Sequence, residues 1–203
     1  MYVVDATGKE PYREWYLPPH IGTQLPPVQP GPDGHFDYLD INSRPFLVAS
    51  LYATVHRVLD IWEGYLGRIV NWSDFAHGQR LELIPLIMWS NAHAGLGFLE
   101  FGFGPDADGQ LDTERPHCAN FDIVAHEVGH SIVFSVIGEP TPGTVTDEFR
   151  GFHESVGDLV ATIALLHFDS ILDYLLDRTA GNLFTINLLS RIGELNQSKQ
   201  LRV

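Results

Sequence analysis

The stretch Asp122-Ile-Val-Ala-His-Glu-Val-Gly-His130 is the part of this 203-residue sequence that says most about its fold. His126 and His130 are four residues apart, so on a helix both imidazoles project from one face and can reach a single cation. Zinc takes imidazole ligands at about 2.0 to 2.1 Å, and Glu127 between them lies within reach of a metal-bound water. The His-Glu-x-x-His spacing therefore predicts a metal-binding helix. Two core histidines and a surface glutamate are the alternative.

A third ligand would distinguish these alternatives, because hydrolytic zinc sites use three protein ligands and a water. In one class of zinc protease this ligand is a histidine six residues after the second, but that position here is Val136, which excludes the class. The segment 151–158 instead supplies Glu154, with Asp158 one helical turn later on the same face. Their apolar neighbours predict an inward-facing pair, whereas a solvated acidic helix face is the alternative.

These two segments resemble the metal helix and the Glu-x-x-x-Asp ligand helix of the thermolysin-like zinc metallopeptidases, of the gluzincin class. Upstream, Asn91 and Ala92, followed by the segment 99–104, are similar to the edge strand with which that family binds substrate backbone. A turn former beside a strand is the other interpretation of Asn91. The resemblance covers about residues 46–170 and implies a zincin-like α+β region. Such a region has a long early helix, a small sheet with an edge strand, a metal-binding helix and a ligand helix.

The resemblance also implies a role for each residue of the motif. Zinc, bound by both histidines and Glu154, would activate a water, and Glu127 would pass its proton to the leaving amine of a peptide. Asp158 would orient the first histidine through its second ring nitrogen. His153 stands where the family usually has asparagine, and it would orient His130 or, less readily, bind the metal.

Several positions depart from the family pattern. His130 and Glu154 are 24 residues apart, a few more than in the type member, so the loop between them is remodelled. In the family, a tyrosine donates a hydrogen bond to the transition state. No tyrosine lies between these two ligands here, and Arg150 is a weak substitute. The family's second catalytic histidine lies well beyond the glutamate ligand, where this chain has only His167. We therefore expect a C-terminal helical lobe to be truncated. The alternative function is a non-catalytic zinc-binding module or a pseudopeptidase.

The sequence gives little support to two further hypotheses, calcium binding and a serine hydrolase. A calcium-binding loop that began at Asp106 would need an oxygen ligand at its fifth position and a glycine at its sixth. These positions are Gln110 and Leu111, so a solvated turn is the better interpretation. Asp122 matches a calcium carboxylate of the family, but Leu165 occupies its partner's position, so calcium binding is predicted to be absent or weak. A serine hydrolase would use Ser131 or Ser155 as its nucleophile. Neither serine lies in the Gly-x-Ser-x-Gly elbow that such an enzyme needs.

Hydrophobic spacing places the motifs on elements. Apolar residues from Phe46 to Leu66 recur at steps of three and four, which predicts a long amphipathic helix. The segments 81–89 and 98–103 are short and apolar or alternating, as strands are, and 104–116 is predicted to be a turn-rich loop. The later predicted helices run from Asn120 to Gly138, from Asp147 to Phe168, and, as shorter helices, within 171–192.

Composition divides the chain into two parts. Eight of its 13 prolines lie within residues 1–45, which predicts an extended Pro-rich arm, followed by a catalytic region over 46–203. The aromatic residues of the arm indicate that parts of it lie against a surface. They are Trp15, Tyr16, Phe36 and Tyr38.

Charge limits the partners. With 12 Lys+Arg against 26 Asp+Glu, the formal charge of -14 repels phosphate backbones and anionic lipid headgroups. Nucleic acid and membranes are therefore poor partners, and a peptide or protein substrate is expected. The sequence shows no signal peptide, and it leaves the compartment open because Cys118 is its one cysteine.

Overall fold

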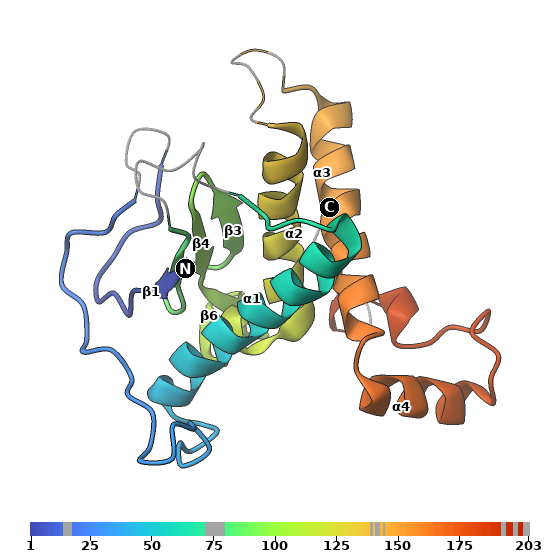
Figure 1. Ribbon diagram of the computed structural model, residues 1–203, viewed down its shortest axis with the longest axis horizontal. Coiled ribbons are helices and arrows are strands. Elements are labelled where there is room, and N and C mark those ends of the chain that lie inside the picture. The colour runs from blue at the N-terminus through green and yellow to red at the C-terminus, as the bar shows by residue number, and fades with distance from the viewer. Residues whose placement is uncertain are drawn as a thin grey trace.

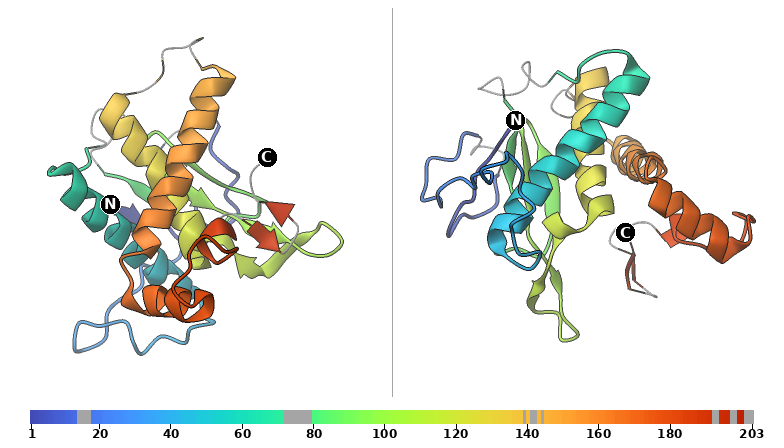
Figure 2. Two further views of the ribbon diagram at one scale, coloured as in Figure 1. Left: turned by 90° about the vertical axis from the view of Figure 1, so that its right-hand side faces the viewer. Right: turned by 60° about the horizontal axis from the view of Figure 1, so that its bottom comes forward.

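The computed structural model describes residues 1–13, 18–71, 80–138, 140, 143, 145–191, 194–196 and 199–200. They form a mixed α+β fold, as predicted, in which a small sheet lies between two layers (Figure 1). Two long helices pack on one face of the sheet, and the N-terminal arm covers the other face (Figure 2, right).

The main sheet has four strands in the order β1-β2-β4-β3. The three strands β1 (Tyr2–Val3), β2 (Glu82–Ile84) and β4 (Phe98–Phe101) run parallel, and β3 (Ala92–Gly95) runs antiparallel to β4. Two of these strands fall inside the predicted strand segments. β3 is a terminal strand of the sheet, at the position where the sequence predicted an edge strand.

A second, two-stranded sheet corrects one prediction. β5 (Phe103–Pro105) and β6 (Leu111–Pro116) form an antiparallel hairpin, so the prediction of an irregular loop over this segment was wrong. The sequence of β6 is polar at successive positions, so it lacks the alternation that marks a half-buried strand. The predicted turn is present, because Asp106 Oδ1 accepts hydrogen bonds from the N–H groups of Asp108 and Gln110 at 2.9 and 2.8 Å.

The first long helix, α1 (Arg44–Leu66), begins two residues before the predicted start. The Ser43 side chain caps it by accepting a hydrogen bond from the Phe46 N–H, and Gly67, with a φ of 64°, ends it. One face of α1 is buried against the sheet and against the helix α2 (Phe121–Ile137). The buried residues are Val48, Leu51, Val55, Val58, Leu59 and Ile61.

The metal-motif helices also match their predictions. α2 (Phe121–Ile137) is capped by the Asn120 side chain and ends at Gly138. α3 (Asp147–Leu165) begins as predicted, after a Thr146 cap, and ends three residues before the predicted end. The remaining elements are a 3-10 turn η1 (His117–Ala119), α4 (Asp169–Thr179), η2 (Leu189–Arg191), β7 (Glu194–Asn196) and β8 (Lys199–Gln200).

Two glycines allow α2 and α3 to approach closely. A Cβ atom added at Gly129 of α2 would lie 2.8 Å from the Cα atom of Gly157 in α3. A Cβ atom at Gly157 would lie 2.5 Å from Nδ1 of His126. Larger side chains would separate these helices, so the glycines place the α2 histidines directly beside α3.

The arm is attached to the sheet by residues near its beginning. Parts of the arm thus lie against a surface, as predicted, and Phe36 lines a pocket beside Val48 and Tyr52 of α1. Tyr38 is exposed, and Trp15 and Tyr16 lie outside the described residues. Among the described residues of the arm, Tyr12 is a buried aromatic residue. It belongs to a second hydrophobic cluster, with Val4, Ala6, Ile84, Ile87 and Phe98.

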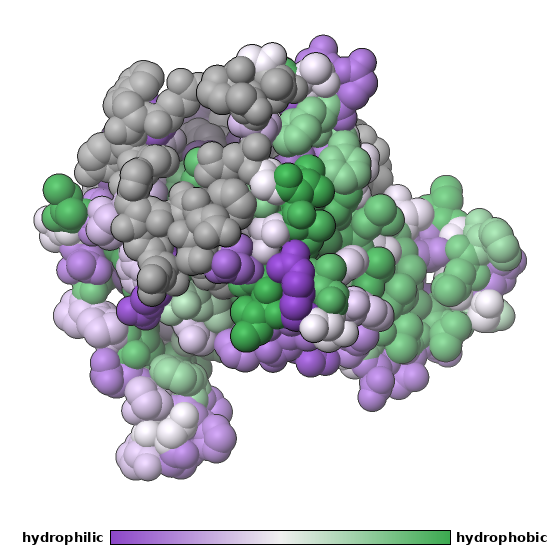
Figure 3. Space-filling view, turned by 45° about the horizontal axis from the view of Figure 1, so that its top comes forward, coloured by the Kyte–Doolittle hydropathy of each residue, from purple (hydrophilic) through white to green (hydrophobic). Residues whose placement is uncertain are grey.

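Hydrophobic side chains also reach the surface around α3 and α4, on the right-hand side of the space-filling view (Figure 3). Phe152 and Leu159 of α3 are 50% and 57% exposed. Among the described residues, no single helix has both the length and the apolar character needed to cross a membrane. α3 and α4 meet that test only when taken together, and they are bent by 93° relative to each other.

Candidate metal centre

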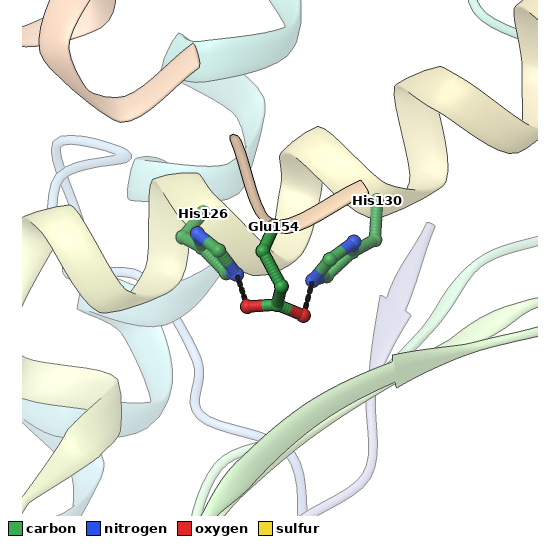
Figure 4. Close-up of side chains that lie close together, drawn as sticks. All are labelled: His126, His130 and Glu154. Atoms are coloured by element: carbon green, nitrogen blue, oxygen red, sulfur yellow. Dashed lines mark ion pairs between the residues drawn. The ribbon is translucent and has the colours of Figure 1, made fainter. Parts of the chain in front are cut away.

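Two histidines of α2 and one carboxylate of α3 converge (Figure 4). The Nε2 atom of His126 lies 3.4 Å from Oε2 of Glu154, and Nε2 of His130 lies 3.5 Å from Oε1 of the same residue. All three donor atoms lie within 4.8 Å of one another. Two ligands bound to one zinc ion in tetrahedral geometry are about 3.3 Å apart, so this donor set fits a single zinc ion.

The convergence point opens into a cleft of about 1090 Å³ between the α2–α3 pair and the edge strand. His126 is buried, but the Glu154 side chain is 49% exposed, so the open side of the centre faces the cleft at this carboxylate. Asn91 and Ala92 line the cleft on the β3 side, and Glu127 lines it on the α2 side. The structure thus brings the predicted metal, base and substrate-binding residues into one cavity.

Asp158 is placed to orient His126. Its Oδ1 atom lies 3.0 Å from Nδ1 of the imidazole. A neutral His126 that donates its Nδ1–H to this carboxylate presents the lone pair of Nε2 toward Glu154. This contact is the one predicted for a carboxylate one turn beyond the third ligand.

His153 contacts the second histidine. Its Nδ1 atom lies 3.3 Å from Nδ1 of His130, and the two rings are stacked with centroids 5.5 Å apart. Burial against Phe134 and Phe149 lowers the pKa of His153, and the charge of Glu154 opposes this shift. A neutral His153 can accept the Nδ1–H of His130, which leaves the other ring nitrogen of His130 for a metal. His153 is not one of the three residues whose donor atoms converge.

Sequence reasoning missed one buried histidine of the cleft. His117 lies in the turn that precedes α2, and burial lowers its pKa despite a hydrogen bond with the Phe103 backbone. No motif marks this position. Phe134, in contrast, lies four residues after His130, so helical spacing could have placed it on the cleft face of α2.

Other predicted residues lie at the border of the cleft or outside it. Arg150 lines the cleft but is largely exposed and pairs with Asp147 at 3.2 Å. His167 lies near the other end of α3, where its Nε2 atom is 2.8 Å from the hydroxyl of Tyr65. The Ser155 hydroxyl donates a hydrogen bond to a backbone carbonyl of its own helix.

Comparisons with known proteins leave the family of the chain open. No protein-family model matches the sequence, and no curated protein matches it either. Among solved structures, the chain is similar to the precursor of protealysin, a metalloproteinase from Serratia proteamaculans, with 18% sequence identity and a TM-score of 0.47. The match covers 70% of this chain and 38% of that one, so the chain spans well under half the length of that structure.

Proposed function

We propose that this chain is a zinc-dependent peptidase of the thermolysin-like, gluzincin class. The observation that carries the proposal is the convergence of His126, His130 and Glu154 on two closely packed helices, beside Glu127 and facing an edge strand. Zinc held by these three residues would supply Lewis acidity, which lowers the pKa of a coordinated water and polarises a carbonyl group.

Glu127 is the residue suited to move protons. It is buried in the cleft wall between the two histidines in sequence, and it is not one of the three residues whose donor atoms converge. Its carboxylate accepts a proton from the attacking water and then delivers that proton to the leaving amine. Burial of this carboxylate near the reacting groups keeps the proton transfer away from bulk solvent.

The substrate class follows from β3. Its partner β4 occupies one side of the strand, and the other side, with Asn91 and Ala92, borders the cleft. An extended peptide can add to such an edge through backbone hydrogen bonds. The net charge of -14 disfavours nucleic acid and membrane surfaces, so we propose a peptide or protein substrate.

One observation favours a second candidate, a zinc-binding module that holds peptides without cleaving them. The cleft-lining residues that the structure describes include no tyrosine, and Arg150 is the one arginine or lysine among them. His167 is engaged with Tyr65. Among the described cleft residues, Arg150 is therefore the one permanently cationic side chain that could stabilise a developing oxyanion.

The test combines metal content with hydrolysis. The dialysed parent protein should contain close to one equivalent of zinc and should cleave a peptide. Glu127→Gln should keep the zinc and lose about 10²-fold to 10⁴-fold in rate, as expected for a general base. Glu114→Gln, on the exposed strand β6, is the matched control and should behave as the parent.

Each other outcome has a clear meaning. Absence of bound zinc in the parent would overturn the proposal. Bound zinc with no hydrolysis of any peptide would favour the non-catalytic module, and equal rates for Glu127→Gln and the parent would remove Glu127 from the mechanism.

A further inference from the structure

Two glutamates are completely buried on the face of the sheet that the arm covers. Glu82 of β2 and Glu100 of β4 are both 0% exposed. The hydroxyl groups of Tyr2 and Tyr12 each donate to Glu82 at 2.6 Å. Glu100 forms an ion pair with Lys9 and accepts a hydrogen bond from the Tyr12 backbone N–H at 2.9 Å. Removal of a charge from water costs several kcal/mol, so these carboxylates depend on partners from the arm.

The partners of Glu100 favour its charged form. Burial alone would raise the pKa of Glu100, but hydrogen bonds from His93, Lys9 and the Tyr12 backbone together lower it. The Lys9 side chain is only 2% exposed, and its ammonium group lies 3.4 Å from the centroid of the Tyr12 ring. Loss of either charge would leave the other one buried without its counterion.

The same carboxylate also holds the edge strand. Nε2 of His93, in β3, lies 2.6 Å from Oε2 of Glu100. The other residues of β3 are two alanines and a glycine, so His93 is its one large side chain. The His93 ring packs edge-on against Trp89 and Phe98, with centroids 4.9 and 5.3 Å away. Apart from backbone pairing with β4, His93 is therefore the main attachment of β3 on this face of the sheet.

A second route joins the arm to β3 through Phe98. The Tyr12 ring packs edge-on against Phe98 at 4.7 Å between centroids. A Cβ atom added at Gly95 of β3 would lie 2.2 Å from the Phe98 ring, so this ring lies directly on the Gly95 backbone. The arm is thus linked to β3 through two residues of β4. Glu100 connects it to His93, and Phe98 connects it to Gly95.

We propose that Lys9 and Glu100 are positioning residues that hold β3 in the geometry needed to bind an extended peptide. The inference rests on the proposed function, in which β3 is the strand that pairs with substrate. A strand fixed before binding loses less conformational freedom when the peptide adds to it, so the affinity for peptide is higher. The arm, about 80 to 90 residues away in sequence, then contributes to substrate binding without lining the metal centre.

The test measures the stability of β3 and the binding of substrate separately. In zinc-loaded Lys9→Met we expect faster hydrogen exchange at the β3 amides, and a KM about tenfold higher for an internally quenched peptide long enough to span the cleft. The kcat and the zinc content should change little, because the altered interaction contributes to binding rather than to the chemical step.

Two further variants make the result specific. Arg44→Met breaks a second ion pair of the described arm residues, in which Arg44 Nε lies 2.9 Å from Oδ1 of Asp5, and it should leave the KM unchanged. If Lys9→Met does not fold, Lys9→Met/Glu100→Met replaces the buried pair by apolar side chains without a stranded charge, and it should show the same two effects.

The proposal is overturned if β3 exchange and KM stay at parent values, or if Arg44→Met raises KM as much as Lys9→Met does. A parent protein that cleaves no peptide would instead refute the proposed function. The exchange of the β3 amides would still report whether Lys9 positions the strand, so the two failures are distinguishable.

Discussion

At the scale of single residues, Glu154 is the acidic member of the converging group, and its contribution to metal binding can be measured directly. We expect Glu154→Ala to lose most of its zinc on dialysis, because two histidines alone hold zinc weakly. Elemental analysis of the dialysed variant measures this loss. If the variant retains a full equivalent, Glu154 is not a ligand and the neighbouring His153 becomes the candidate.

His117 predicts a dependence of stability on pH. Its pKa in the folded protein is lowered from 6.5 by burial, so the unfolded chain takes up a proton at a higher pH than the folded chain does. The contribution of neutral His117 to stability is therefore complete above pH 6.5 and is lost as the pH falls through that value toward the folded pKa. We expect the melting temperature of His117→Gln to fall less than that of the parent between about pH 7 and pH 5.

The comparison for His117 is best made on metal-free protein, in which metal release does not contribute. His35→Gln, which changes an exposed histidine of the arm, should follow the parent. A His117→Gln curve that parallels the parent over this pH range would show that His117 does not contribute to the acid sensitivity.

At the scale of elements, the crossing of α2 and α3 is the contact on which the metal centre depends. An alanine at Gly157 would place its methyl group 2.5 Å from Nδ1 and 2.6 Å from Cε1 of His126. We expect Gly157→Ala to lower the melting temperature and to weaken zinc affinity by about 10-fold to 100-fold, as displacement of a ligand's supporting contacts does. Thermal unfolding and competition with a chelator measure the two effects.

Gly151 provides the matched control on the same helix. It also lies in α3, but no atom outside the backbone of its own helix lies within 4 Å of the position that its Cβ would take. Gly151→Ala should leave zinc affinity unchanged and should stabilise the helix by about 0.5 to 1 kcal/mol. If both variants bind zinc as the parent does, the close crossing is not needed to place His126.

The elements also show what the sequence could predict. The helices α1 to α3 were predicted to within a few residues because each combines apolar spacing with a recognisable cap, such as Asn120. β6 was missed because its polar residues lack alternation, and β1 was missed because two residues in a Pro-rich segment pair with a strand about 80 residues away. The spacing of four residues between His126 and His130 was enough to predict that both lie on one face of a helix.

The rest of the cleft region depends on tertiary contacts that no local pattern contains. Glu82 and Glu100 are acidic residues among apolar neighbours in their strands, and a glutamate is normally placed in solvent. They are buried because the arm supplies tyrosine and lysine partners from far along the chain. His117 was missed for a similar reason, since only the packing of its turn carries it into the cleft.

At the scale of the whole molecule, we expect this chain to be a weak catalyst. Loss of one oxyanion donor typically costs about 10² to 10³ in rate, and the described cleft residues offer Arg150 but no tyrosine. The kcat/KM of the chain should therefore lie below about 10⁴ M⁻¹s⁻¹ in a peptidase assay. A value above this would show that another group stabilises the transition state, and Arg150 and His153 would be the first residues to replace.

We expect the exposed apolar side chains to favour association between copies of the chain. Phe152 and Leu159 are about half exposed along α3, on the helix that carries Glu154. Light scattering that increases with protein concentration would report such association. The activity should therefore be measured over a range of protein concentrations.

The pairing of β1 with β2 also has a consequence for the order of folding. Tyr2 and Glu82 are 80 residues apart, whereas His130 and Glu154 are 24 residues apart. Loop-closure entropy makes the longer connection about 1 kcal/mol more costly, and contacts of low contact order generally form sooner. We expect the helical hairpin with the metal ligands to form before the sheet is complete. Because Lys9 precedes Glu100 in the chain, Lys9 stays hydrated during synthesis until Glu100 has been added and β4 has formed.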